Sequence, residues 1–581
     1  MANIFNSIRV RRPKRNAFDL SYENKLTCKM GQLIPIMNIP VIPGDKIRVN
    51  TEALIRFAPM LAPVMHRVNA FVYYFFVPYR LLWPTINAAS PQGVGNGWEN
   101  FITKGIDGDS VPDFPCVTYH ETATGEAVET YTPVEGYWSP SKVDYSGLDI
   151  SKLYGTGSLW DYIGLPSVNP KWNATYNEGL VELPTGFKVS AFPFMAYQMI
   201  YNEYFRDQNL QEPINLHNLS STPQFDDITS LVDILTLRTK AWEKDYFTSA
   251  LPWTQRGPEV TVPISGQSEV VVDPDAINKY PVFTKQGDPS TSYPVGRLGQ
   301  VVTGVYTLDD SGATTANHLV YNPKGTLVVD NESSGGISIN DLRTSNALQR
   351  WLEKNARGGS RYIEQIFAHF GVRSSDSRLQ RPQYLGGGRI PISFSEVLQT
   401  SATETDSPQA NMAGHGIAAS GAPKFKAFFE EHGVVLGILS IIPRTAYQQG
   451  INREWTKFDN MDYYFPEFAH LSEQPIYNQE IYADQDAERN AGIFGYTPRY
   501  AEYKTHLDET HGAFRESLSY WHLGRIFRQS TPPVLNGDFV QAQPSSRIFA
   551  VEEQNVENIY IQLYNHVSAL RLMPKYGTPN L

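Results

Sequence analysis

The feature that most constrains how this chain folds is a strand-like stretch crowded with aromatic residues. The stretch VNAFVYYFFVPYRLLWP, from Val68 to Pro84, holds seven aromatic residues among its seventeen. An ordinary half-buried strand alternates apolar and polar residues, because one of its faces meets water. Here both faces are apolar: Phe71, Tyr73 and Phe75 lie on one, and their alternates on the other. We therefore predict a strand that is covered on both faces.

Strand signals dominate both ends of the chain. Prolines at 35, 40 and 43 punctuate β-branched runs at a density that excludes helix. Residues 432–443 form a continuous apolar run of strand length, and residues 559–574 alternate cleanly. No regular alternation of strand and helix occurs, which excludes a doubly wound sheet. We predict a mainly β protein in which strands distant in sequence pair in an antiparallel β-sandwich that carries large insertions.

The same signals divide the chain into five segments. We predict a basic arm over residues 1–17 and the first strands of the sandwich over 18–84. A long loop excursion follows over 85–258, with a helix near 192–210 that begins beside Pro193. Residues 259–336 are polar and rich in Gly, Ser, Thr and Val, which predicts a variable surface insertion. Helices and then the remaining strands occupy 337–581.

The composition is that of a protein with large buried contacts. Charged residues make up 19%, below the roughly 25% of typical soluble domains. Tyrosines number 33 and tryptophans 10. Few charges and many aromatic residues resemble the cores of protein–protein interfaces. Composition alone also fits a large β-rich globular protein, so this alternative stays open.

Positive charge is concentrated at the amino terminus. The net charge is −11, yet the first fifteen residues carry five basic side chains and no acidic one, so the rest carries −16. A short basic arm on an acidic body is typical of nucleic-acid binding, and a plain solvated tail is the alternative. The predicted nucleic-acid-binding residues are Arg9, Arg11, Arg12, Lys14 and Arg15.

Several other classes of protein are disfavoured. Cys28 and Cys116 are too few and too far apart for a disulfide framework. The first residues lack the apolar core of a signal peptide, and Pro78 and Arg80 interrupt the one stretch that could approach a membrane span. We therefore expect a protein that is not secreted by the usual route and does not enter a membrane.

No enzyme motif is present in the sequence. HExxH, GxSxG, P-loop and GxGxxG patterns are all missing. The nearest acid–base cluster is 430–432, and 506–511 places two histidines around two acidic residues. We interpret both as hydrogen-bonded surface groups and predict no catalytic, cofactor-binding or metal-binding residue.

A series of longer motifs resembles one family. FDLSYENKLTCKMGQLIPI begins at Phe18, YYFFVPYRLLW at Tyr73, NEYFRDQNLQ at Asn202, YQQGINREW at Tyr447 and WHLGRIF at Trp521. These stretches, with others in the same order from about residue 18 to 540, resemble the major capsid protein of microviruses (Microviridae), in its gokushovirus-type branch. The resemblance is weak over 85–190 and 259–336.

The resemblance implies a structural protein and not an enzyme. It implies an eight-stranded antiparallel jelly roll that self-assembles into a small T=1 icosahedral shell around a circular single-stranded DNA genome. Residues 259–336 would form the protrusion at the threefold axes, where the shell could attach to a host surface receptor. The implied partners are identical capsid subunits, a small basic DNA-packaging protein, a scaffolding protein and minor pilot or spike proteins, with no membrane. The protein would reside in a bacteriophage virion assembled in the host bacterial cytoplasm.

Two other functions remain as alternatives. A carbohydrate-binding or carbohydrate-cleaving β-sandwich would fit the abundance of Trp and Tyr. A plain single-stranded DNA-binding protein would need basic residues spread along a groove, whereas the sequence suggests that they are confined to one arm. Five arm charges are few against one phosphate per nucleotide. We therefore expect polyamines, metal ions or the packaging protein to neutralise most of the genome.

Overall fold

The computed structural model divides the chain into two units. Residues 1–254 and 358–581 form the first unit, and residues 255–357 form the second. The described residues are 14–84, 97–103, 114–119, 128–134, 137–143, 150–168, 183–184, 186–216, 224–225, 228–257, 269–272, 282–285, 288–294, 319–321, 327–330, 339–359, 361–373, 375–398, 412–527, 532–551 and 556–576. Among them, no helix is both long enough and apolar enough to cross a membrane.

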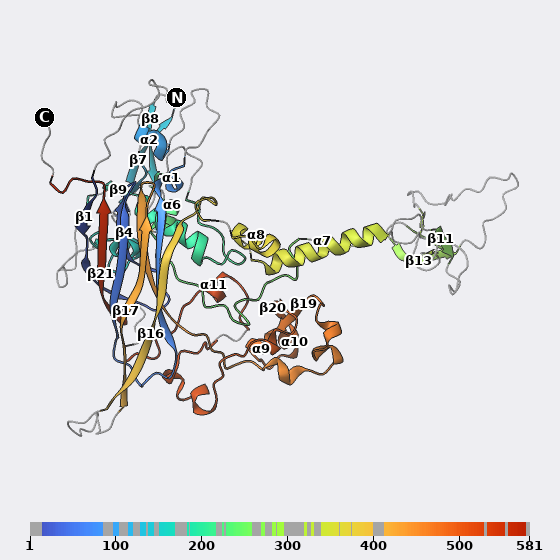
Figure 1. Cartoon of the computed structure of the whole chain (residues 1–581). Coiled ribbons are helices and arrows are strands. Elements are labelled where there is room, and N and C mark those ends of the chain that lie inside the picture. Colours follow the sequence, from blue (N-terminus) through green and yellow to red (C-terminus); the bar gives the residue numbers. More distant parts are fainter. Residues whose placement is uncertain are drawn as a thin grey trace. The chain divides into compact units, whose positions relative to one another are not determined.

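The first unit is built on an antiparallel sheet that curls into two layers. The first layer has the order β2 (Tyr22–Cys28), β21 (Ile559–Arg571), β4 (Lys46–Phe57) and β17 (Met412–Phe428). The second layer has the order β3 (Ile34–Val41), β18 (Gly433–Pro443), β5 (Val68–Pro78) and β16 (Gln383–Leu398). Figure 1 shows β21 in red, β4 in blue and β17 in orange side by side. Distant segments therefore pair, as predicted.

The two layers are joined through β16. Its first part pairs with β5, up to Ile392, and its second part pairs with β17, from Ser393. A short strand, β1 (Asn16–Asp19), adds to β21 beside β2. These nine strands thus form one continuous sheet and not two separate ones. The result is the antiparallel β-sandwich of a jelly roll, which confirms the predicted fold class, although the predicted count of eight strands is not confirmed.

One buried core lies between the layers. It takes inward side chains from β4 and β21 on one side and from β3, β5 and β18 on the other. Across it, the rings of Tyr74 and Phe425 lie 5.0 Å apart. The Tyr74 hydroxyl donates to Thr51 Oγ1 at 2.6 Å, and the Thr51 hydroxyl donates to Asn565 Oδ1 at 2.7 Å. These bonds satisfy polar groups that would be costly to bury unpaired, and they tie β5, β4 and β21 together.

The outer face of β5 is covered by a second core. Its cover is α5 (Phe192–Ile200) and the π-helical turn Tyr201–Phe205. The ring of Phe205 lies 5.2 Å from that of Tyr73, and the ring of Tyr204 lies 4.7 Å from that of Phe75. The prediction of a strand covered on both faces is confirmed. The cover comes from the excursion that follows β5 in the same chain.

The helix near residue 192 is shorter than predicted. It begins at Phe192 and ends at Phe205, not at Leu210. The backbone of Arg206 is extended, and the next residues form a turn in which Asp207 Oδ1 accepts a hydrogen bond from the Asn209 amide. A side chain that bonds nearby backbone amides in this way competes with helix propagation.

The remaining elements of the first unit are short. Before β16 they are α1 (Tyr79–Leu82), α2 (Trp98–Thr103), β6 (Cys116–Thr118), β7 (Val128–Val134), β8 (Tyr137–Val143), α3 (Ile150–Tyr154), α4 (Leu159–Ile163), β9 (Lys188–Ser190), β10 (Gln224–Phe225), α6 (Ile228–Leu235) and α8 (Tyr362–Phe370). After β18 they are β19 (Glu473–Tyr477), α9 (Asn478–Ile481), α10 (Ala487–Ala491), β20 (Ile493–Pro498) and α11 (Gly537–Val540), with 3₁₀ turns between them.

The second unit contains short antiparallel strands and one long helix. The strands are β11 (Glu269–Val272), β12 (Val282–Lys285), β13 (Asp288–Pro294), β14 (Leu319–Tyr321) and β15 (Leu327–Asp330), and the helix is α7 (Ile339–Arg357). β11 pairs with β15, and β12 pairs with β13 and β14. The predicted insertion over 259–336 lies inside this unit.

Lys240 is the one basic group described against the aromatic face of β5. Its Nζ lies 3.8 Å from the centre of the Phe71 ring and donates to Tyr73 Oη at 2.7 Å. Burial lowers the pKa of Lys240 from 10.5 to about 8. Between these two values the unfolded chain binds more protons than the folded one, so this residue adds stability as the pH rises.

We expect the effect to appear in a comparison with Lys240→Met. The free energy of unfolding of the natural protein, relative to the variant, should rise between pH 7.5 and 9, because deprotonation relieves a buried ammonium. Urea unfolding at the two pH values measures this. A difference between the two proteins that stays constant with pH would contradict the assignment.

Candidate assembly interface and basic surface

An exposed group of aromatic side chains lies on the segment after β18. Phe458 is 90% exposed and Trp455 is 73% exposed, which is unusual for such large apolar groups. We call aromatic surface the exposed residues Trp455, Phe458, Tyr463, Tyr464, Phe465 and Tyr503. The last four of these also line a surface hollow, with Tyr500. A concentration of this kind on one chain marks an interaction site.

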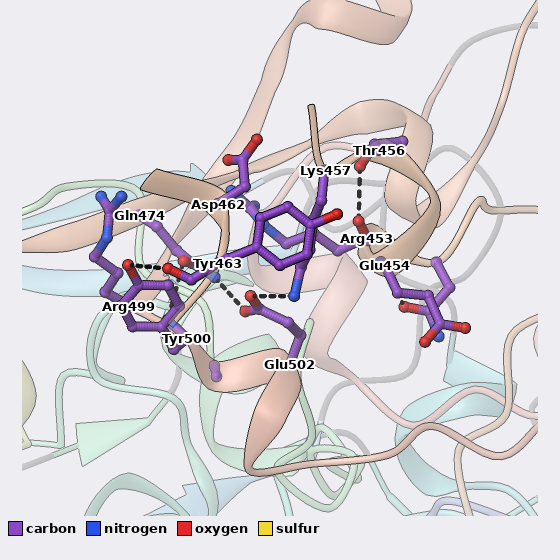
Figure 2. Close-up of polar contacts among 12 residues, drawn as sticks. Arg453, Glu454, Thr456, Lys457, Asp462, Tyr463, Gln474, Arg499, Tyr500 and Glu502 are labelled. Atoms are coloured by element: carbon purple, nitrogen blue, oxygen red, sulfur yellow. Dashed lines mark hydrogen bonds and ion pairs between the residues drawn. The ribbon is translucent and has the colours of Figure 1, made fainter. Parts of the chain in front are cut away.

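The aromatic surface is held in place by an ion pair beneath it. Lys457 Nζ lies 3.3 Å from Glu502 Oε1, and both side chains are largely shielded from water. The same Nζ lies 3.7 Å from the centre of the Tyr503 ring. Glu502 Oε2 accepts a hydrogen bond from Gln474 Nε2 at 2.7 Å. Figure 2 shows Lys457 and Glu502 joined below the ring of Tyr463.

Tyr500 fixes the loop that carries the aromatic residues. Its hydroxyl lies 3.0 Å from the carbonyl oxygen of Met461 and 3.1 Å from that of Tyr463. Its amide donates to Gln474 Oε1 at 3.0 Å, and Arg499 Nη2 donates to the Met461 carbonyl at 2.8 Å. Tyr500 has φ of +62°, a conformation that costs a non-glycine residue energy. These bonds offset that cost.

A second buried pair anchors the start of the segment. Arg453 Nη1 donates to Glu480 Oε1 at 3.1 Å and to the Pro475 carbonyl at 2.7 Å. The Tyr246 hydroxyl donates to Glu480 Oε2 at 2.8 Å. Burial raises the pKa of Glu480 despite the neighbouring Arg453 guanidinium. The aromatic surface therefore rests on a rigid base, so little side-chain and loop entropy is lost when it is covered.

Sequence reasoning predicted abundant interface aromatics but did not locate them. The signal that could have done so is FDNMDYYFPEF, from Phe458 to Phe468, which has five aromatic residues in eleven and neither helix nor strand periodicity. Aromatic residues that fit no core-facing period are candidates for exposure. Among the periodic stretches, β5, β18 and β21 proved to be core, whereas Leu348 and Trp351 on the helix at 339–357 are exposed.

The predicted basic arm is described only at its end. Arg9, Arg11 and Arg12 lie outside the described residues, whereas Lys14 and Arg15 lie just before β1 and are exposed. The Arg15 guanidinium lies 5.8 Å from the centre of the Phe428 ring, on β17. The arm therefore joins the body at the outer face of the first sheet layer.

The expectation that basic residues are confined to the arm is wrong. Lys46 and Arg48 on β4, and Lys424 and Lys426 on β17, are exposed on that same outer face. Sequence reasoning missed them because the two strands are more than 350 residues apart and each contributes only two cations to the group. Only the pairing of β4 with β17 brings the four together.

The two acid–base clusters weighed from sequence have structural partners. Glu431 Oε2 accepts a hydrogen bond from Arg80 Nε at 2.6 Å, and the ring of His432 lies 5.7 Å from that of Trp98. His511 Nε2 lies 2.9 Å from Glu509 Oε2 at the surface. Within the described ranges no group of three or more His, Cys, Asp or Glu could hold a metal ion.

Fold and surface together define a class of protein. A jelly roll that exposes a rigid aromatic surface has the features of a protein that is covered by other protein in an assembly. The model of the family described as "Capsid protein (F protein)" matches residues 6–144 and 156–581, which include 259–336 and most of 85–190, where the motif resemblance is weak. The chain belongs to this family of phage capsid proteins.

Named relatives agree with the family. The chain is 33% identical to capsid protein VP1 of Chlamydia phage 1, over 100% of this chain and 98% of that protein. It is 34% identical to capsid protein VP1 of Bdellovibrio phage phiMH2K, over 97% and 95% of the two chains. It is 28% identical to capsid protein VP1 of Spiroplasma virus 4, over 98% and 95%. The resemblance to microvirus capsid proteins of the gokushovirus type is confirmed, and the chain is a structural protein of a phage virion and not an enzyme.

Proposed function

We propose that identical copies of this chain close into a T=1 icosahedral shell around a circular single-stranded DNA genome. The observation that carries the proposal is the aromatic surface, which is exposed in the single chain and braced by two buried ion pairs. In a closed shell the same contact repeats around the symmetry axes, so a modest contact suffices, because several neighbours hold each subunit at once.

The first test is negative-stain microscopy of purified protein, with absorbance at 260 and 280 nm on the same fraction. Uniform closed particles support the shell, and the absorbance ratio separates filled from empty ones. If the chain alone stays monomeric, a second preparation made with a scaffolding protein tests whether assembly requires that partner. A monomer in both preparations that retained glycans on an array would favour the carbohydrate-binding alternative instead.

The basic arm would bind the genome through phosphates without sequence preference. Arg9, Arg11, Arg12, Lys14 and Arg15 are the proposed contacts. Contacts of this kind release counterions and are strongly weakened by salt. The family resemblance favours a small basic packaging protein as the source of most neutralising charge, with polyamines and metal ions as others.

We expect deletion of residues 9–15 to lower DNA content and leave folding intact. The deleted residues precede every described strand, so the two sheet layers keep all their pairings. The measurement is the 260/280 absorbance ratio of purified particles, with the unfolding midpoint as control. Particles with unchanged DNA content would show that the arm does not bind the genome.

The insertion over 259–336 is the proposed site of host attachment. Its support is its polar composition and its place in a compact unit separate from the sandwich. The matching experiment compares adsorption to host cells by intact particles and by particles in which a short linker replaces these residues. Equal adsorption would contradict an attachment role. Assembly in the host cytoplasm, with a scaffolding protein and minor pilot or spike proteins, completes the proposal.

A further inference from the structure

The outer face of the first sheet layer carries a compact group of cations. Arg48 on β4 stands directly opposite Lys426 on β17, and Asn50 stands opposite Lys424. Lys46, two residues before Arg48, shares its face and stands opposite Phe428. Neighbouring positions are about 4.8 Å apart across the strands and about 6.8 Å apart along them, so the four charges fall within a small area. We call this group the basic sheet face: Lys46, Arg48, Lys424, Lys426 and Phe428.

The cations of the basic sheet face have no carboxylate partner among the described side chains. Nearby acids already have other partners. Glu52 lies 3.6 Å from His566, Asp19 accepts hydrogen bonds from Ser21, and the carboxylate of Asp45 lies 3.2 Å from Arg571 Nε. Like charges placed directly opposite on neighbouring strands destabilise a sheet. The Arg48–Lys426 pair thus costs stability, which points to an external anion as the reason for its position.

An exposed aromatic ring adjoins these charges. Phe428 is 50% exposed and lies 5.8 Å from the Arg15 guanidinium. Gly44 lies in the turn before Lys46. Arg15 Nη2 lies 3.9 Å from the position that a Cβ atom on Gly44 would occupy, so the guanidinium is close to this turn. The last basic residue of the arm, Arg15, therefore lies on the basic sheet face, and the two form one continuous positive surface. Cations beside an exposed ring are the two elements that bind single-stranded nucleic acid, through phosphates and stacked bases.

We propose that the basic sheet face binds single-stranded DNA, with phosphates on its four cations and a base stacked on Phe428. The inference rests on the proposed enclosure of a DNA genome and deepens it. With these four cations, the number of basic side chains on each subunit that can contact phosphate rises from the five of the arm to nine. Because the contacts involve the phosphate backbone and any base can stack, binding does not depend on sequence.

The test uses the full chain and a fluorescent thymidine oligonucleotide of about thirty nucleotides, longer than one binding site. Anisotropy gives the binding constant from about 50 to 200 mM salt, where counterion release sets the slope. The double variant Arg48→Gln/Lys426→Gln removes two proposed phosphate contacts. The matched control is Lys25→Gln/Arg56→Gln. It removes the same charge from exposed positions on the outer side of the first layer that are not part of the basic sheet face.

The two variants should separate clearly. Each lost contact lowers the slope of log binding constant against log salt by about 0.7, so Arg48→Gln/Lys426→Gln should lower it by about 1.4. The control should keep the natural slope, and an equal fall in both variants would overturn the proposal. Absence of oligonucleotide binding by the natural protein would also overturn it.

Phe428→Ala provides an independent measurement. Loss of one stacked base should weaken binding by about five- to a hundredfold without changing the salt slope. Polyglutamate is the competing anion without bases: if it displaced the oligonucleotide as well as unlabelled DNA does, the face would be assigned to an acidic protein instead. Particle formation by each variant is checked by microscopy. Particles that form while the DNA results fail would overturn this inference and leave the shell intact.

Discussion

Replacing Trp455 and Phe458 together with serine should yield folded subunits that no longer assemble. Both side chains project into solvent from the aromatic surface, so their removal leaves no cavity in the sandwich. Truncation of an aromatic residue that is buried at the centre of an interface costs about 2 kcal/mol or more of binding free energy. The loss is repeated at every symmetry-related contact, so the expected result is complete disappearance of particles and not a partial fall.

The measurement is sedimentation velocity of the purified variant, with circular dichroism to show that it is folded. The control is Met65→Ser/Tyr576→Ser, which removes two side chains of similar exposure, 66% and 77%, from other parts of the surface. Particles formed by Trp455→Ser/Phe458→Ser at the natural yield would refute the role of the aromatic surface. If both double variants failed to assemble, the contact would not be specific to this surface.

Arg571→Met should be the most destabilising single change described here. Asp45 is fully buried in the turn before β4, and Arg571 at the end of β21 is its only basic partner among the described residues. Arg571 Nη2 also donates to the Pro40 carbonyl at 2.8 Å. Removing one member of a buried ion pair leaves an uncompensated charge and costs about 3–5 kcal/mol. Urea unfolding at pH 7 should show a loss of this size.

The pH dependence of this loss identifies its cause. Burial raises the pKa of Asp45 above 3.8, although the Ile42 amide and Arg571 act in the opposite direction. Without Arg571 the pKa of Asp45 in the folded form rises further, so the variant loses stability relative to the natural protein as the pH rises from 4 to 7. Asp45→Asn in the same chain should restore part of the loss. If Arg571→Met were equally destabilising at both pH values and without rescue by Asp45→Asn, packing and not charge would explain it.

Local patterns predicted the strands well and the helix end poorly. The continuous apolar run became β18, which is buried along its whole length, and the alternating run became β21. These succeed because a strand's period of two is visible within a few residues. The end of the helix at Phe205 depended on bonds made by Asp207, which compete with a favourable helical pattern.

The candidate surfaces also differ in how far the sequence predicts them. The arm is contiguous, so its charge is visible in fifteen residues of sequence. The basic sheet face is assembled from β4 and β17, and its register could not be known before the sheet was seen. The rigidity of the aromatic surface depends on Lys457 and Glu502, 45 positions apart, and no local period predicts that they meet. A single sequence does not show which distant segments pair, so neither surface could be predicted from it.

The position of β21 has a consequence for synthesis of the protein. This strand lies between β2 and β4, so the first layer cannot close until the ribosome has made residues 559–571, about 500 residues after β4. Until then the edges of β2 and β4 lack their partner, and such edges are prone to pair with other chains. Closure of this layer must therefore follow the synthesis of β21. Until then we expect chaperones to bind the unpaired strands. Because β1 also pairs with β21, the segment that joins the basic arm to the sheet cannot take its place before β21 emerges from the ribosome.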